Sequence, residues 1–170
     1  MIRCIGLFFL CGGLCMLGVC AAQCLKSRER NLKDLICGLE AVRREMQYSL
    51  APLGDLFRLG AAQTTGNVSA FFAEVAECTD DINGGGFKTN WVHMLGKHQL
   101  YLTEADLIVL RQLGVVLGRY DGDEQLRALE AVIDRLGDLC RLAEERSGRL
   151  GKVYTTLGMV SGAFVFLLLI

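Results

Sequence analysis

The residues with the greatest potential for chemistry are a glycine-rich segment and two histidines. The run from Gly84 to Thr89 looks like the end of a phosphate-binding loop, but the GxxxxGK[ST] pattern requires glycine where Ile82 and Phe87 stand. Without those glycines the backbone amides cannot wrap a phosphate, so we interpret the run as a surface loop. His93 and His98 are five residues apart and therefore do not share a helix face. No cysteine pair at finger spacing joins them, so we predict no zinc site and expect surface or partly buried histidines.

Cysteine is the other residue type with reactive potential. Five of the eight cysteines fall within one apolar run, and three are scattered: Cys4, Cys11, Cys15, Cys20 and Cys24, then Cys37, Cys78 and Cys140. The first group could line a path for a metal, but cysteines four residues apart on a helix also provide small, polarisable surface for close helix contact, which we favour. The scattered cysteines are interpreted as small buried hydrophobes in a reducing cytoplasm. We therefore predict no catalytic residue, no metal site and no cofactor.

Two apolar runs at the ends of the chain are the strongest signal for its organisation. No charged side chain occurs from Cys4 to Leu25 or from Val153 to Ile170. About 18 to 25 apolar residues suffice for a helix to cross about 30 Å of hydrocarbon. We predict a transmembrane helix over residues 4–25, a cytosolic helical bundle over 26–152 and a second transmembrane helix over 153–170.

Basic residues beside the two runs indicate which side the central domain faces. They lie on the domain side of both runs, and only Arg3 lies on the other side: Lys26, Arg28, Arg30 and Lys33, then Arg146, Arg149 and Lys152. Because basic residues favour the cytoplasmic side, the central domain is predicted to be cytoplasmic. The alternative is an extracytoplasmic helical interaction protein with a signal anchor, for which cleavage after Ala22 would be the mark.

Apolar periodicity predicts an all-α domain. Leucines and other apolar residues recur at helical spacing from about Leu25 to Ser49 and again from Leu126 to Ala143, and the chain has a single proline, Pro52. We expect two long helices, continuous with the membrane spans, to lie antiparallel as a stalk. Between them, shorter helices are predicted over 52–63, 68–78, 87–97 and 104–117, the last opened by a capping box of Thr103 and Asp106.

Overall charge does not favour a nucleic-acid surface. The chain carries 18 Lys and Arg against 19 Asp and Glu, a formal net charge of −1. A protein that binds the phosphate backbone needs an excess of basic residues, so no nucleic-acid partner is predicted.

Three pairs of small residues spaced by four suggest close contact between helices. Gly114 and Gly118 share one helix face, and Asp121 and Gln125 follow at the start of the last helix, which predicts a tight joint there. A glycine inside a helix costs about 1 kcal/mol relative to alanine, so the contact must compensate for that loss. In the membrane spans the small residues form a GxxxG-like surface: Gly18 with Ala22, and Gly158 with Gly162. We favour a hairpin within one molecule over a contact between copies, which would make a homo-oligomer.

The joint carries a motif that resembles a known family. Leu113-Gly114, Leu117-Gly118, Asp121 and Gln125 match the LGxxLGxxDxxxQ motif of the stage III sporulation protein AB family of endospore-forming bacteria. The resemblance extends across the chain, through Glu45, Tyr48, Pro52 and Leu53, an isolated Trp91, and a closing pattern of Tyr154, Leu157-Gly158 and residues 167–170. It departs from the family in the cysteine-rich first run and at Tyr120, where a small hydroxyl residue is usual.

The resemblance implies a specific role. Proteins of this family belong to a sporulation operon whose products assemble a channel between mother cell and forespore, and they sit in the outer of the two forespore membranes. The expected partner is the operon's secretion-type ATPase, since the central domain is similar to cytoplasmic helical domains of type II secretion and type IV pilus platform proteins. The expected function is thus a non-enzymatic membrane scaffold. A membrane-bound enzyme would instead require a cluster of reactive residues.

Overall fold

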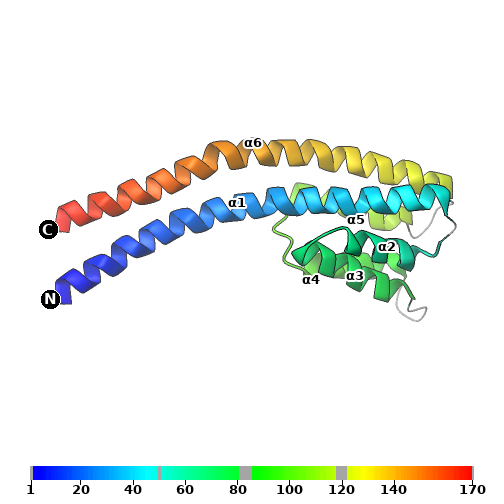
Figure 1. The fold of residues 1–170 in the computed structure, drawn as a ribbon, viewed down its shortest axis with the longest axis horizontal. Coiled ribbons are helices and arrows are strands. Elements are labelled where there is room, and N and C mark those ends of the chain that lie inside the picture. Colours follow the sequence, from blue (N-terminus) through cyan, green and yellow to red (C-terminus); the bar gives the residue numbers. More distant parts are fainter. Residues whose placement is uncertain (1, 50, 81–85, 118–121, 170) are drawn as a thin grey trace. The chain divides into compact units, whose positions relative to one another are not determined.

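In the computed structural model of this chain, the described residues form six α-helices joined by short connections. The structure describes residues 2–49, 51–80, 86–117 and 122–169, and gives only the backbone for 2–12, 14, 15, 80, 122, 155, 158, 162, 163 and 165–169. The helices are α1 (Ile2–Tyr48), α2 (Leu53–Ala62), α3 (Gly66–Asp80), α4 (Phe87–Lys97), α5 (Glu104–Leu117) and α6 (Gly122–Leu169) (Figure 1). The prediction of an all-α protein is confirmed, and the described residues contain no strand.

The chain divides into two compact units. The first contains residues 1–29 and 142–170, and the second contains residues 30–141. In the first unit the beginning of α1 and the end of α6 run antiparallel (Figure 1). Gly18 and Ala22 are half-buried there, whereas Gly158 and Gly162 lie outside the residues whose side chains are described. The domain boundaries at residues 25 and 153 remain a prediction.

Both apolar runs belong to the first unit. Among residues with described side chains, no helix provides a stretch of the length and apolarity needed to cross a bilayer. The predicted spans include many residues outside that set, among them 2–12 and 165–169.

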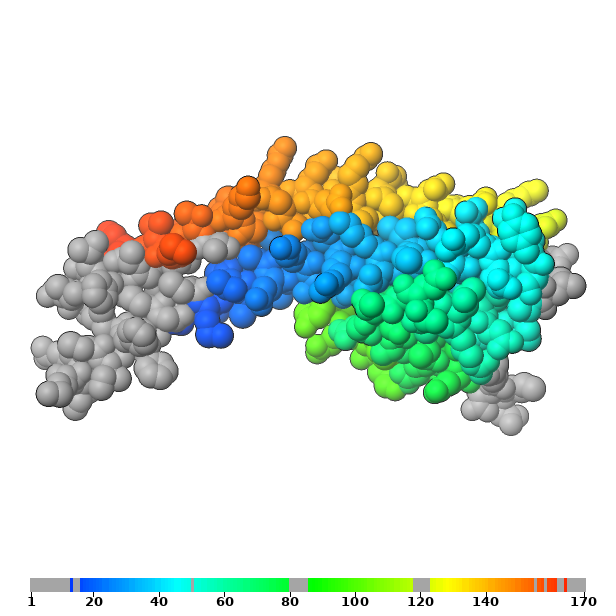
Figure 2. All heavy atoms as spheres, in the orientation of Figure 1, coloured from blue at the N-terminus to red at the C-terminus, as the bar shows by residue number. Residues whose placement is uncertain are grey.

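The core of the second unit is built on the apolar stripe of α1. Leu32, Leu35, Leu39 and Val42 are fully buried, at the helical spacing that the sequence shows. The short helices α2, α3 and α4 lie along one side of α1 (Figure 1), and α1, α2 and α3 form a continuous surface in the space-filling view (Figure 2). On α6, Leu129 and Leu136 are fully buried as well. A hydrogen-bonded ion pair of 2.9 Å between Arg43 Nη1 and Glu130 Oε1 joins the two long helices in this unit.

Close contact of α1, α2 and α3 depends on small residues. A Cβ atom added to Gly38 would lie 2.3 Å from Phe72 Cε2, and one added to Gly60 would lie 3.2 Å from the Gly38 carbonyl oxygen. Because real Cβ atoms do not approach other atoms as closely as 2.3 Å, any larger residue at position 38 would force the Phe72 ring or α1 to shift. Glycine at these positions therefore sets the spacing of the helices.

Polar side chains define where the short helices begin and end. Pro52, with φ of −57°, directly precedes α2. The prediction placed it within the first turn of this helix, one residue too early for the start of α2. After α2 ends, the Thr64 hydroxyl donates to the Gly60 carbonyl at 3.0 Å. At the start of α5 the carboxylate of Asp106 accepts hydrogen bonds of 2.8 Å from both the amide and the hydroxyl of Thr103. This is half of the predicted capping box, and it places the first residue of α5 at Glu104.

Candidate functional site

Trp91 is at the centre of the packing in the second unit. Its side chain is buried, and its ring centroid lies 5.6 Å from that of Phe57, 5.2 Å from that of Phe71 and 5.7 Å from that of Phe87. The indole Nε1 donates a 2.7 Å hydrogen bond to the Leu110 carbonyl in α5. A carbonyl inside a helix usually bonds only to the helix backbone, so this extra bond fixes the rotation of the indole. The single tryptophan thus connects α2, α3, α4 and α5.

Gly114 provides the space into which the tryptophan fits. A Cβ atom at this position would lie 2.4 Å from Trp91 Cδ1 and 2.8 Å from Cγ. The sequence predicts that this glycine admits a neighbouring helix. In the structure the group that occupies the space is the indole of α4, so the loss of helix propensity at Gly114 is offset by close packing of a large ring.

Gln125 links the end of α5 to the start of α6. Its side-chain Nε2 donates a 3.2 Å hydrogen bond to the carbonyl of Leu117, the last residue of α5. Carbonyls in the last turn of a helix have no partner within the helix, so this bond acts as a cap from the next element. Two further motif residues, Gly118 and Asp121, lie outside the described part of the chain. Pro52 is exposed at the start of α2.

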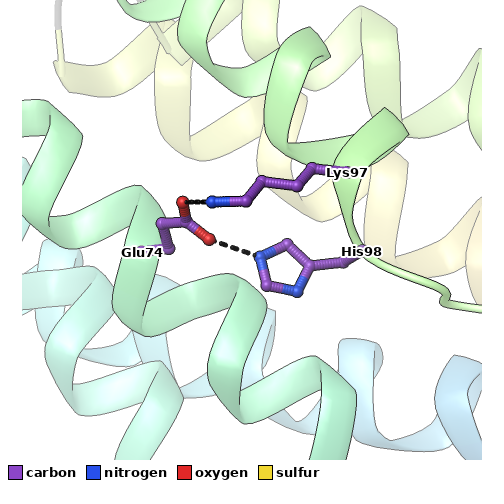
Figure 3. A network of polar contacts seen from close by, with 3 residues as sticks. All are labelled: Glu74, Lys97 and His98. Atoms are coloured by element: carbon purple, nitrogen blue, oxygen red, sulfur yellow. Dashed lines mark hydrogen bonds and ion pairs between the residues drawn. The ribbon is translucent and has the colours of Figure 1, made fainter.

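A network of polar contacts among three residues links the end of α4 to α3. His98 Nε2 lies 2.7 Å from Glu74 Oε2, and Lys97 forms an ion pair with the other oxygen of the same carboxylate (Figure 3). The ammonium group of Lys97 and then the imidazole of His98 lower the pKa of the Glu74 carboxyl below its ordinary value, although partial burial acts in the opposite direction. His98 is half-buried and His93 is exposed.

The segment from His98 to Leu102, here called the 98–102 connection, is held in place by two further side chains. Asn67 Nδ2 donates to the Gln99 carbonyl at 2.8 Å, and Asn31 Nδ2 of α1 donates to the Leu100 carbonyl at 2.7 Å. The Leu100 side chain is 3% exposed, which anchors the middle of the segment in the core. A loop with this many bonds to neighbouring helices keeps a defined conformation.

Tyr101 departs from ordinary backbone geometry within this connection. Its φ is +52°, the one positive value among the non-glycine residues that are described, and its side chain is 50% exposed. A bulky residue in this region costs roughly 1 kcal/mol or more, and such residues cluster at functional sites. A hollow of about 330 Å³ adjoins the tyrosine, lined mainly by Leu95, Leu100, Leu102 and Leu107. The connection therefore presents a half-exposed aromatic ring beside an apolar depression, which is a suitable surface for a protein partner.

The sequence does not indicate Glu74 or Tyr101 as site residues. Glu74 meets His98 across 24 positions of the chain, and no local pattern marks a tyrosine that will adopt a left-handed conformation. Within the described part of the chain, no group of three or more His, Cys, Asp or Glu residues is arranged to hold a metal ion.

Comparisons with known proteins agree on one family, and the two sequence matches cover nearly the whole chain. Residues 3–170 match the model of the family described as stage III sporulation protein AB. A curated relative, stage III sporulation protein AB of Bacillus subtilis (strain 168), is 26% identical over 171 residues, which cover 99% of each chain. A solved structure of a stage III sporulation protein AB aligns with 71% of this chain and 96% of its own length, with 25% identity and a TM-score of 0.63.

Proposed function

The chain belongs to the stage III sporulation protein AB family, and from this membership we propose that it is a non-enzymatic membrane scaffold of the channel complex between mother cell and forespore. In this proposal residues 4–25 and 153–170 anchor the chain in the outer forespore membrane on the mother-cell side. The central domain, residues 26–152, faces the cytoplasm and docks a secretion-type ATPase.

The basic residues beside the apolar runs support the orientation. Lys26, Arg28 and Arg30 follow the first run, and Arg149 and Lys152 precede the second. Both groups favour the cytoplasmic side of a bilayer. A reporter enzyme that works only outside the cytoplasm should therefore be active when fused after residue 170 and silent when inserted between α3 and α4. The reverse pattern would contradict a cytoplasmic domain and favour the extracytoplasmic alternative.

The 98–102 connection is the observation that carries the docking proposal. Tyr101 is exposed, conformationally restricted and next to an apolar hollow. A partner that contacts the exposed ring and the adjoining hollow gains apolar burial. The backbone that carries the ring is already held by the hydrogen bonds from Asn31 and Asn67, which reduces the entropy lost on binding.

Bonds from the connection to the helices support transfer of position or force. Asn31 binds the Leu100 carbonyl directly, and Asn31 belongs to α1, which continues without interruption toward the first apolar run. A displacement of the connection would thus act on α1 through this hydrogen bond. Such coupling suits a scaffold that relates an ATPase to events in the membrane.

Co-purification of the full-length chain with the ATPase of its own operon tests the docking. Loss of an anchoring tyrosine costs about 2 kcal/mol or more, so Tyr101→Ala should weaken binding by about thirtyfold. Tyr101→Asn should weaken it similarly, because asparagine tolerates a positive φ and only the ring is removed.

A second tyrosine provides the matched control. Tyr48 is 86% exposed at the end of α1, so Tyr48→Ala removes the same side chain away from the connection and should leave binding unchanged. Equal binding by the Tyr101 and Tyr48 variants would contradict docking at this surface. Failure to recover the ATPase with the unaltered chain would contradict the docking function itself.

A further inference from the structure

A groove in the first unit separates α1 from α6 and adjoins the proposed membrane surface. Its volume is about 780 Å³, and residues from both helices line it, including Ala22 and Lys26 of α1 and Gly148, Gly151 and Lys152 of α6. Cβ atoms added to Gly148 or Gly151 would meet no atom within 4 Å. The two glycines thus leave open space along α6 and do not serve close helix contact at these positions.

Two lysines give this groove available positive charge. Neither Lys26 nor Lys152 takes part in an ion pair among the described residues. Two carboxylates, Glu29 and Glu144, also line the groove, and both are engaged in interactions of their own. Two unneutralised ammonium groups on facing helices favour an anion between them.

The order of residues along the helices places the lysines nearer to the apolar runs than the carboxylates. With a rise of about 1.5 Å per residue, Glu29 lies about 4.5 Å beyond Lys26 along α1, away from the first run. On α6, Glu144 lies about 12 Å from Lys152, away from the second run. The groove therefore has a basic end toward the proposed bilayer and an acidic end away from it.

An apolar hollow extends the basic end along α6. This hollow, of about 350 Å³, is lined by Lys152 and Thr156, which also line the groove, and by Val153, Leu157 and Val160. The last three side chains are each more than half exposed. A basic groove that continues into exposed apolar side chains is complementary to an amphiphile, in which an anionic group is attached to a hydrocarbon chain.

We propose that the groove binds one anionic glycerophospholipid from the membrane. The phosphodiester lies between the ammonium groups of Lys26 and Lys152, and an acyl chain follows Val153, Leu157 and Val160. The lipid then bridges α1 and α6, so its binding would hold the two helices of the first unit together at the bilayer surface. This inference rests on the proposed membrane anchoring. The apolar hollow favours a phospholipid over free phosphate, which would gain nothing from it.

Native mass spectrometry of the full-length chain in mild detergent tests the proposal. Phosphatidylglycerol and phosphatidylcholine are added separately, and the bound lipid is counted on the intact protein. We expect one retained phosphatidylglycerol and much weaker retention of phosphatidylcholine. Lys26→Gln and Lys152→Gln should each weaken phosphatidylglycerol binding by roughly fivefold, the effect of one basic residue near an anionic lipid.

Variants paired with controls distinguish lipid binding in the groove from general effects of charge and folding. Gly148→Leu fills the open space and should abolish the bound lipid, while the helix itself gains propensity and so remains folded. Gly137→Leu is the control, since Gly137 lies on α6 in the second unit and an added Cβ there would also meet no atom within 4 Å. This variant should leave lipid binding unchanged. Lys88→Gln removes one exposed lysine of α4 and should also have no effect.

Three results would overturn the proposal. Equal retention of the two lipids would remove the role of the lysines, and unchanged retention by Gly148→Leu would place the lipid elsewhere. Displacement of the lipid by inorganic phosphate alone would make the groove a site for free anions. Membrane fractionation is done first, because it tests the membrane anchoring separately from the lipid site. A chain that stays in the supernatant contradicts the anchoring, whereas a membrane-bound chain that retains no particular lipid contradicts only the proposed lipid site.

Discussion

Substitution of Gly114 by alanine should destabilise the second unit through a single contact. The added methyl group would lie 2.4 Å from Trp91 Cδ1, so either α5 or the indole must move. The indole has little freedom, because its Cβ is itself only 3.2 Å from the added atom and because rotation of the ring breaks the 2.7 Å bond from Nε1 to the Leu110 carbonyl. The substitution therefore combines overpacking with a weakened buried hydrogen bond.

The magnitude follows from three opposing effects. Overpacking a core costs about 1 to 3 kcal/mol, and a lost hydrogen bond costs about 1 kcal/mol. Replacing glycine by alanine inside a helix returns about 1 kcal/mol. We expect the free energy of unfolding to fall by about 1 to 3 kcal/mol for Gly114→Ala.

The change in the free energy of unfolding is measured by chemical denaturation of the full-length chain in detergent, with circular dichroism as the probe. The fluorescence of Trp91 reports on the same site, since it is the only tryptophan, and its emission should shift to longer wavelength as the ring is displaced. Gly137→Ala serves as the control, because its Cβ would meet nothing within 4 Å and helix propensity alone should stabilise the chain by about 1 kcal/mol. If the Gly114→Ala protein were as stable as Gly137→Ala and its emission were unchanged, the packing of the Trp91 indole against Gly114 would be refuted.

The remaining predictions concern polar groups at the two ends of the 98–102 connection. Because the pKa of Glu74 is lowered in the folded chain, its contribution to stability is present above the ordinary value of 4.5 and is lost as the pH falls through the folded value. Glu74→Gln should therefore lower stability at neutral pH and reduce the loss of stability in acid, and unfolding curves with the same pH dependence as the unaltered chain would contradict the network. Thr103→Ala removes the hydroxyl that donates to Asp106 at 2.8 Å and should lower the free energy of unfolding by about 1 kcal/mol. Thr103→Ser keeps the hydroxyl and should lose much less stability, so an equal loss in both variants would contradict a capping role.

Local patterns in the sequence predict the helices well. The stripe of Leu32, Leu35 and Leu39 becomes the buried face of α1 because residues three and four apart share a helix face. The Thr103 and Asp106 pair marks the start of α5 because its hydrogen bonds are formed between neighbours in the chain. Each of these signals is complete within a few residues, so it can be identified before the fold is known.

Contacts between distant residues could not be predicted in the same way. Gly114 was expected to allow close contact, but the sequence does not reveal that the partner is the indole of Trp91, 23 residues earlier. The bonds from Glu74 to His98 and from Asn31 to Leu100 depend on how α1, α3 and α4 pack. Tyr101 adopts a left-handed conformation directly after the buried Leu100, and no feature of the tyrosine itself predicts it.

Recruitment of the secretion-type ATPase to membranes tests the central claim most directly. Phospholipid vesicles that contain the full-length chain, and empty vesicles as the control, are mixed with the purified ATPase and floated through a density gradient. A membrane-anchored scaffold with an accessible central domain predicts that the ATPase floats only with vesicles that contain the chain, and that Tyr101→Ala abolishes most of this recruitment. An ATPase that stays at the bottom of the gradient, or floats equally with empty vesicles, would contradict the scaffold function.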